Sequence, residues 1–290
     1  STTTRLSLTD RLREYAVLLK LRLSFLVVVS AVLGYFFSHN NNLYDILLLV
    51  GGGFLVTGSS NACNQVWERE YDAIMKRTQK RPLVTGTLSV GEALTVCIVT
   101  GISGLVLLYF LNPLSMVLGF LAFFLYVFIY TPMKRISSWS VFVGAFPGAI
   151  PPMLGYVAAT GEFGLVPGIL FLVQFMWQFP HFWAIAWVQH DEYMKAGYRM
   201  LPSDSGRNST SAFIILVYTV ICVLVSFAPF VIGEAGYLTV GVCSLLGVIF
   251  IKNAMKLQST LEIAQGKRLM FTSFYYLPLI QLIYVIEKWI

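Results

Sequence analysis

Three side chains that carry oxygen ligands follow one another at intervals of four residues: Asn64, Glu68 and Asp72. On an α-helix this spacing places them within an arc of about 80° and over about 12 Å of helix, whereas Glu70 points to another side. A row of hard oxygen ligands suits Mg²⁺, which binds few carboxylates and keeps water or phosphate oxygens around it. The pattern therefore indicates a candidate metal site on one helix face.

Cationic side chains that could bind phosphate oxygens surround the same segment. They are Arg69, Lys76, Arg77, Lys80 and Arg81. The alternative interpretation is a solvated helix end whose charges pair at intervals of four, such as Asp72 with Lys76. Spacing alone favours neither interpretation.

A second acidic cluster, Asp191 and Glu192, follows His190 and precedes Tyr193 and Lys195. An ordinary hydrophilic loop could have the same composition. However, the chain holds only 14 Asp and Glu residues, and two clusters of them follow predicted helices at one face. Facing carboxylate sets could hold a diphosphate through bridging magnesium ions, because without a metal they would repel it. The predicted metal ligands are Asn64, Glu68, Asp72, Asp191 and Glu192.

The elements that carry these clusters are expected to be membrane-spanning helices. The chain of 290 residues is 57% hydrophobic and 12% charged, against about 25% charged in ordinary soluble domains. This composition excludes a soluble enzyme, a disordered protein and a disulfide-stapled secreted module. Long apolar runs without alternation predict an all-α bundle of nine transmembrane helices. The expected spans are 16–38, 43–64, 90–111, 113–131, 139–159, 165–189, 211–232, 236–252 and 271–287.

The lysine and arginine residues predict the orientation of this bundle. All 20 of them except Lys288, including Arg5, fall in segments on one side of the predicted spans. The positive-inside rule assigns that side to the cytoplasm, together with the amino terminus. The net charge of +6 is explained by membrane topology, and no nucleic acid is expected as a partner. We expect one polytopic domain over residues 1–290, with about residues 1–15 as a cytoplasmic amino-terminal segment.

The four cysteines are interpreted as small buried hydrophobic residues rather than as a disulfide or a metal site. They are Cys63, Cys97, Cys222 and Cys243, each in or beside an apolar run, and no two form a Cys-x-x-Cys pair.

Several segments, in order along the chain, resemble the UbiA-type intramembrane prenyltransferases, and within them the haem-farnesylating branch. The resemblance covers roughly residues 15–285. Its motifs are Asn64/Glu68/Asp72 with Lys76–Thr78 and Arg81–Leu83, Tyr130–Arg135, Gly144–Tyr156, Trp177–Phe182, and Asp191–Gly197 ahead of Met200–Pro202. Two departures concern the site: the family usually has Asp where Glu68 stands and lysine where His190 stands.

The resemblance implies transfer of a farnesyl group from farnesyl diphosphate to a vinyl group of haem B, with Mg²⁺ as cofactor. It implies catalytic roles for the five metal ligands and Tyr193. Diphosphate would be bound by Arg69, Lys76, Arg77, Arg81, Lys134, Arg135 and Lys195, and haem by His181 and Arg22. It further implies a multi-pass protein of the bacterial cytoplasmic membrane, with the lipid bilayer as surroundings and a haem A synthase or terminal oxidase as a partner.

Alternatives remain open for single residues and for the function. A lone buried histidine such as His181 is more often structural than a ligand, and Arg22 could simply extend to the membrane surface. The aromatic residues of the fourth and sixth spans could shield a cation or could only pack against lipid. The competing functions are prenylation of a quinone-precursor aromatic and, from another class, secondary transport.

Overall fold

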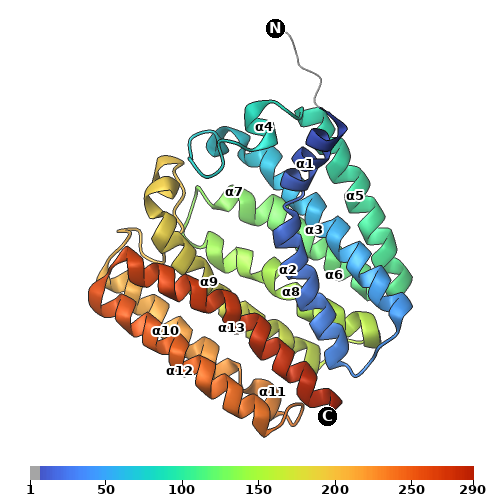
Figure 1. Ribbon diagram of the computed structural model, residues 1–290, viewed down its shortest axis with the longest axis vertical. Helices are drawn as coiled ribbons and strands as arrows, with labels where there is room; N and C mark the ends of the chain where they lie inside the picture. Colours follow the sequence, from blue (N-terminus) through green and yellow to red (C-terminus); the bar gives the residue numbers. More distant parts are fainter. Residues whose placement is uncertain (1–6) are drawn as a thin grey trace.

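The computed structural model describes residues 7–290, so the predicted cytoplasmic residue Arg5 lies outside the described part. The described residues form helices without strands (Figure 1). Their bounds are α1 Leu8–Leu18, α2 Leu21–Phe37, α3 Leu43–Asp72, α4 Pro82–Thr85, α5 Val90–Leu111, α6 Pro113–Phe124, the π-helix η1 Leu125–Tyr130, α7 Thr131–Met133, α8 Ser140–Thr160, α9 Leu165–Lys195, α10 Ser209–Val225, α11 Ala228–Val231, α12 Tyr237–Thr260 and α13 Ile263–Trp289.

The predicted all-helical membrane bundle is confirmed for the described residues. Eight helices are long and apolar enough to cross a membrane, and the α1–α2 pair, bent by 52°, raises the number to nine. The span 90–111 coincides with α5. By contrast, α3, α9 and α12 continue six to eight residues past their predicted ends, and α13 begins eight residues before its predicted start. These extensions are more polar than the spans that they continue.

Caps explain where several helices begin. Asn42 accepts hydrogen bonds from the backbone nitrogens of Tyr44 and Asp45 at the start of α3. Ser89 and Glu92 form a reciprocal capping box at the start of α5. Asn112 caps α6, whose first residue is Pro113, at a position where a missing N–H costs nothing.

Helix α8 lies in the middle of the bundle and packs against α2, α6 and α9. Close approach requires glycine at two points between α2 and α8. A Cβ atom on Gly34 would lie 2.0 Å from the Pro152 carbonyl oxygen, and one on Gly155 would lie 1.7 Å from that of Ala31. These contacts fix α2, and therefore the segment that precedes it, against the centre of the bundle.

The interpretation of the four cysteines was wrong for one pair. Cys63 of α3 and Cys97 of α5 form a disulfide with their Cα atoms 6.0 Å apart. The sequence spacing of the cysteines could not predict this pairing, because the two residues are neighbours only after α3 and α5 pack side by side. Cys222 and Cys243 are free and buried, as predicted.

Candidate active site

The first cluster lies on the buried face of α3. Asn64, Glu68 and Asp72 are exposed by only 1%, 6% and 1%, whereas Glu70 is exposed. Asp72 pairs with Arg81 and not with Lys76. The alternative of a solvated helix end is therefore wrong, and the predicted common face is confirmed as a burial pattern.

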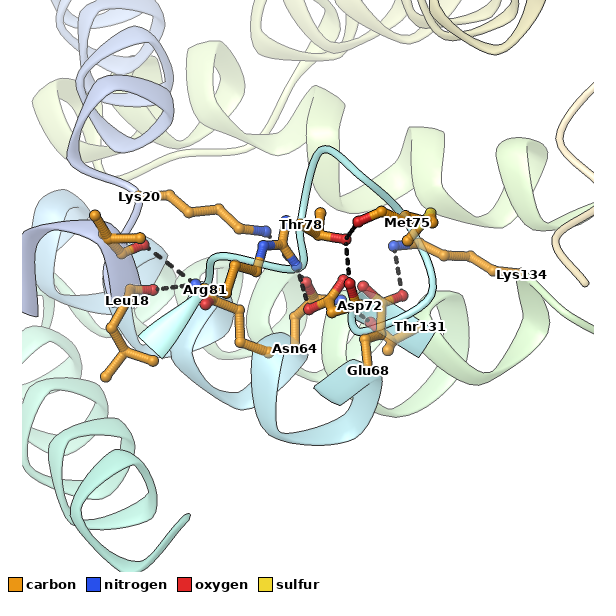
Figure 2. A network of polar contacts seen from close by, with 12 residues as sticks. Leu18, Lys20, Asn64, Glu68, Asp72, Met75, Thr78, Arg81, Thr131 and Lys134 are labelled. Carbon is orange, nitrogen blue, oxygen red and sulfur yellow. Dashed lines mark hydrogen bonds and ion pairs between the residues drawn. The ribbon is translucent and has the colours of Figure 1, made fainter. Parts of the chain in front are cut away.

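Each of these three residues is bound by one cationic side chain. Lys20 donates to Oδ1 of Asn64 at 3.2 Å, Lys134 donates to Oε1 of Glu68 at 2.8 Å, and Arg81 donates to Oδ2 of Asp72 at 2.5 Å. Figure 2 shows the three cations converging on the oxygen atoms from three different segments of the chain. We call these six residues the charged cluster.

The segment after α3 brings Arg81 back to the helix that it follows. Thr78 donates from its hydroxyl to the Asp72 carbonyl oxygen at 2.9 Å, and the Arg81 backbone nitrogen donates to the Thr78 carbonyl oxygen at 2.9 Å. This compact turn returns the chain towards the carboxylate. Pro82 then begins α4 directly after Arg81 and fixes the exit of the chain.

The π-helix η1 places Lys134. The Thr131 hydroxyl donates to the Tyr126 carbonyl oxygen at 2.8 Å and accepts from Nδ2 of Asn64 at 3.0 Å. A π-helical stretch accommodates the missing N–H of Pro132, and such stretches are frequent at functional sites. Lys134 follows immediately and reaches Glu68.

The surroundings of Lys134 keep it positively charged. Burial opposes the charged form, but the Glu68 carboxylate outweighs burial, so the pKa of Lys134 is raised above its usual value. The ammonium also lies over the rings of Tyr130 and Tyr198, at 4.7 Å and 5.9 Å from their centroids. The cluster thus presents aromatic faces to positive charge.

One oxygen of the charged cluster has no partner. Oδ1 of Asp72 is buried without a hydrogen bond, while Oδ2 binds Arg81. Nowhere in residues 7–290 do three His, Cys, Asp or Glu side chains form a group that could hold a metal alone. The donor set of two carboxylates and one amide nevertheless fits Mg²⁺, which completes its shell with water and phosphate oxygens.

The second acidic pair lies near the charged cluster, but its carboxylates have other partners. Glu192 accepts from the backbone nitrogen of Lys76 at 2.8 Å and from Nζ of Lys195 at 2.7 Å. The side chain of Asp191 is 72% exposed and pairs with Arg207 at 3.2 Å. The structure does not gather the five predicted metal ligands into one group.

The chain after this pair also touches the charged cluster. The Arg199 backbone nitrogen donates to the Lys134 carbonyl oxygen at 3.1 Å. The ring of Tyr193, a predicted catalytic residue, is half-buried and lies 6.0 Å from that of Tyr198.

The predicted diphosphate ligands fall into two groups. Arg81 and Lys134 are part of the charged cluster. The others lie at its edge or outside it: Arg69 is on the outer side of α3 at 3.8 Å from Glu70, Arg135 stacks on the Tyr71 ring, Lys195 pairs with Glu192, and Lys76 and Arg77 are exposed.

The predicted haem ligands differ in their surroundings. Nδ1 of His181 lies 2.8 Å from the Ser273 hydroxyl, and its ring stacks on Trp177 with centroids 4.2 Å apart. Arg22 lies instead at an outer groove of about 560 Å³ lined by Leu21, Phe25, Leu26 and Phe54. His181 is therefore held inside the bundle, whereas Arg22 is exposed on its outer surface.

Sequence reasoning missed Lys20 as a member of the charged cluster, because the predicted span 16–38 contains it. A lysine that starts a membrane helix ordinarily extends to water, so its type gave no sign of an inward direction. Tyr198 and Thr131 were missed because their contacts join segments far apart in the sequence.

Comparison with known proteins identifies a family and several relatives of this chain. The pattern of the UbiA prenyltransferase family matches residues 27–276. The protoheme IX farnesyltransferase of Christiangramia forsetii is 45% identical over 285 residues, 96% of this chain and 94% of that protein. The protoheme IX farnesyltransferase of Cytophaga hutchinsonii is 40% identical over 282 residues, 96% of this chain and 99% of that protein.

Solved structures share the fold. A digeranylgeranylglyceryl phosphate synthase superposes with a TM-score of 0.80 at 18% identity, over 96% of this chain and 99% of that chain. A UbiA homologue from Archaeoglobus fulgidus bound to GPP and Mg²⁺ gives a TM-score of 0.69 at 15% identity, over 95% of this chain and 98% of that one. Taken with the near-full-length sequence matches, these findings show that the chain belongs to the UbiA prenyltransferase family.

Proposed function

We propose that this protein transfers the farnesyl group of farnesyl diphosphate to a vinyl group of haem B, with addition of water, to give haem O. The observation that carries the proposal is the charged cluster, three cations around buried oxygen ligands, in a chain 45% identical to a protoheme IX farnesyltransferase over 96% of its length. Such a cluster suits a diphosphate, and the relatives' name supplies the acceptor.

The cluster would stabilise the leaving group. The bond between farnesyl carbon 1 and oxygen breaks, and the electron pair leaves with the diphosphate, whose negative charge Arg81 and Lys134 would bind. Bound Mg²⁺, held by Asn64, Glu68 and Asp72, would supply further charge stabilisation at the leaving oxygens. The related archaeal structure with GPP and Mg²⁺ supports use of a divalent ion here.

Asp191 and Glu192 are proposed as the second ligand set for the metal diphosphate. Glu192 already contacts the segment between α3 and Arg81 through the Lys76 backbone. Asp191 is exposed next to it, so its carboxylate can change partner without a large desolvation cost. Lys76, Arg77, Arg135 and Lys195 are exposed and would attract the anion.

The allylic cation would form a bond with the haem vinyl group, and water would then add to the resulting cation and lose a proton. Tyr130 and Tyr198 already hold their ring faces towards the Lys134 ammonium and could stabilise positive charge. His181, stacked on Trp177, is proposed to serve haem. We make no such proposal for Arg22, because it faces an outer groove.

The proposal extends to the protein's place in the cell. We propose that it lies in the bacterial cytoplasmic membrane with the charged cluster towards the cytoplasm, as the cation distribution indicates. Haem O would pass to a haem A synthase or a terminal oxidase. Transport is not favoured, since the acids of α3 lie at a helix end and are already paired with cations.

Product analysis tests the reaction. The purified protein in lipid vesicles would be given farnesyl diphosphate and Mg²⁺ with either haem B or 4-hydroxybenzoate, and extracts would be separated by chromatography. A new haem product with no prenylated benzoate supports the proposal. Prenylation of 4-hydroxybenzoate with unchanged haem would instead assign the quinone-precursor reaction.

A further inference from the structure

The bend between α1 and α2 directs Lys20 into the bundle. Helix α1 ends at Leu18 and α2 begins at Leu21, with a bend of 52° between their axes. Lys20 occupies the bend with φ of 47°, in the left-handed region that residues with a Cβ atom rarely adopt. Its neighbours must therefore impose this conformation.

Two amide side chains of α3 hold the bend. Gln65 donates from Nε2 to the carbonyl oxygens of Val17 and Leu18 at 3.2 Å and 2.7 Å. Asn61 donates from Nδ2 to the carbonyl oxygen of Leu19 at 3.2 Å. The last carbonyls of a helix lack intrahelical partners, and Gln65 supplies one for the Leu18 carbonyl oxygen. The carbonyl oxygens of Val17 and Leu19 also accept from the Lys20 backbone nitrogen and the Ser24 hydroxyl, so the amides add a second contact there.

The same two amides lie beside the metal-ligand row. Asn61, Gln65 and Asn64 are all buried on the inward side of α3, so the helix that carries the candidate ligand also fixes the lysine that binds it. Figure 2 shows Leu18 and Lys20 on the same side of the cluster as Arg81.

Lys20 differs from the other two cations in its partner. Arg81 and Lys134 each bind a carboxylate, whereas the Lys20 ammonium donates to the neutral amide oxygen of Asn64. An ammonium has three N–H donors, so its charge and two donors are available to an anion.

We propose that Lys20 is a further diphosphate-binding residue and that Asn61 and Gln65 are its positioning residues; this inference rests on the proposed function of the same site. Before substrate enters, Lys20 occupies Oδ1 of Asn64, where its charge opposes a metal ion. A diphosphate offers the ammonium a better acceptor and frees the amide oxygen for the metal. Metal and diphosphate binding are then coupled through Lys20.

The test uses binding without turnover, with Mg²⁺ alone and with inorganic pyrophosphate at saturating Mg²⁺, measured by calorimetry on the purified full chain in lipid vesicles. In Lys20→Met we expect pyrophosphate affinity to fall about tenfold or more, because charged hydrogen bonds are lost. Affinity for Mg²⁺ alone should rise, because a competing cation is gone. Lys20→Arg should restore most of the pyrophosphate affinity.

If Gln65 positions Lys20, variants of the two residues should have the same effect on binding. Gln65→Leu should reproduce both changes of Lys20→Met, and the double variant should be no worse than Lys20→Met alone. The matched control is Lys256→Met, an exposed lysine on α12, which should change neither affinity. A melting curve accompanies each variant; should Lys20→Met unfold, Lys20→Gln, which keeps an N–H donor for Asn64, replaces it.

Equal affinities in Lys20→Met and Lys256→Met would overturn the inference, as would a fall in Mg²⁺ affinity. If Lys20→Met binds pyrophosphate normally and the wild-type protein still makes haem O, the inference about Lys20 fails but the proposed function stands. Wild-type protein that binds neither Mg²⁺ nor pyrophosphate would contradict the proposed function itself.

Discussion

The charged cluster holds three basic side chains against two carboxylates in a buried region. Lys20, Arg81 and Lys134 face Glu68 and Asp72 at the end of α3. Electrostatic interactions are strengthened where water is excluded, and a buried charge that loses its partner is costly. The cluster is thus suited to receive an anion and sensitive to the loss of any single member.

Asp72→Asn should reduce turnover by at least about a hundredfold, because a lost ligand charge removes several kcal/mol of transition-state stabilisation. Excess EDTA should also abolish turnover of the wild-type protein. Rates would be measured on protein shown by melting curve to be folded, since Arg81 loses its ion pair in this variant.

The matched control is Glu70→Gln, because Glu70 lies two residues earlier on the exposed side of the same helix and should be neutral. Wild-type turnover in EDTA would contradict the metal requirement.

The hydrogen bonds of Ser273 fix the orientation of His181. The Ser273 hydroxyl donates its single proton to the Met270 carbonyl oxygen at 2.6 Å, so it accepts from Nδ1 of the histidine. A neutral His181 then has its lone pair on Nε2, which is the atom that could bind iron or accept a proton.

His181→Ala should impair haem binding with farnesyl diphosphate affinity nearly unchanged, since the histidine lies about 15 Å along α9 from Asp191. Ser273→Ala should weaken haem binding less, because it removes orientation and not the ring. Each substrate would be titrated separately, with haem followed by its Soret absorbance. Loss of farnesyl diphosphate binding with normal haem binding would contradict the assignment.

Sequence periodicity predicted that Asn64, Glu68 and Asp72 share one face of α3. It could also have shown that Arg69 lies on another face, because each residue along a helix is rotated by about 100° from the one before it. It could not predict Lys20. The inward direction of that side chain depends on a left-handed residue and on amides from another helix. Such contacts follow from tertiary packing and leave no local pattern.

At the scale of the elements, α3 and α9 are longer than a membrane requires. Their 30 and 31 residues correspond to about 45 Å, against about 30 Å of hydrocarbon. Hydropathy finds the apolar part of each helix but not the polar turns that continue it, which is why the predicted ends fell short. Those additional turns carry both acidic clusters.

The disulfide predicts a definite thiol count. Alkylation of the unfolded protein should modify two cysteines without reductant and all four after reduction, because Cys63 and Cys97 are joined. Replacing both by serine should lower the free energy of unfolding by about 2–4 kcal/mol. Mass spectrometry of intact protein gives the count, and four modified cysteines without reductant would contradict the pairing.

At the scale of the whole molecule, the two ends of the described chain lie at opposite edges of the bundle (Figure 1). The charged cluster is on the side of α1 and α4, and Lys288 near the carboxyl end of α13 is on the other side. Hydropathy and the distribution of Lys and Arg predicted this arrangement. Both are properties of whole segments of the sequence, so they do not depend on how individual side chains pack.

We predict that the amino terminus faces the cytoplasm and the carboxyl terminus the opposite side, as nine crossings require. Alkaline phosphatase is active only outside the cytoplasm, so it should be active when fused after Ile290 and inactive when fused before Ser1. Activity at both ends, or at the amino terminus alone, would contradict this topology.

The most direct test of the central claim is the mass of haem recovered after incubation with farnesyl diphosphate and Mg²⁺ in water enriched with heavy oxygen. We predict that haem B gains one farnesyl group and one hydroxyl group, that the hydroxyl oxygen comes from the solvent, and that Asp72→Asn gives no such product. Unchanged haem B in the presence of folded, membrane-inserted wild-type protein and both substrates would contradict the account.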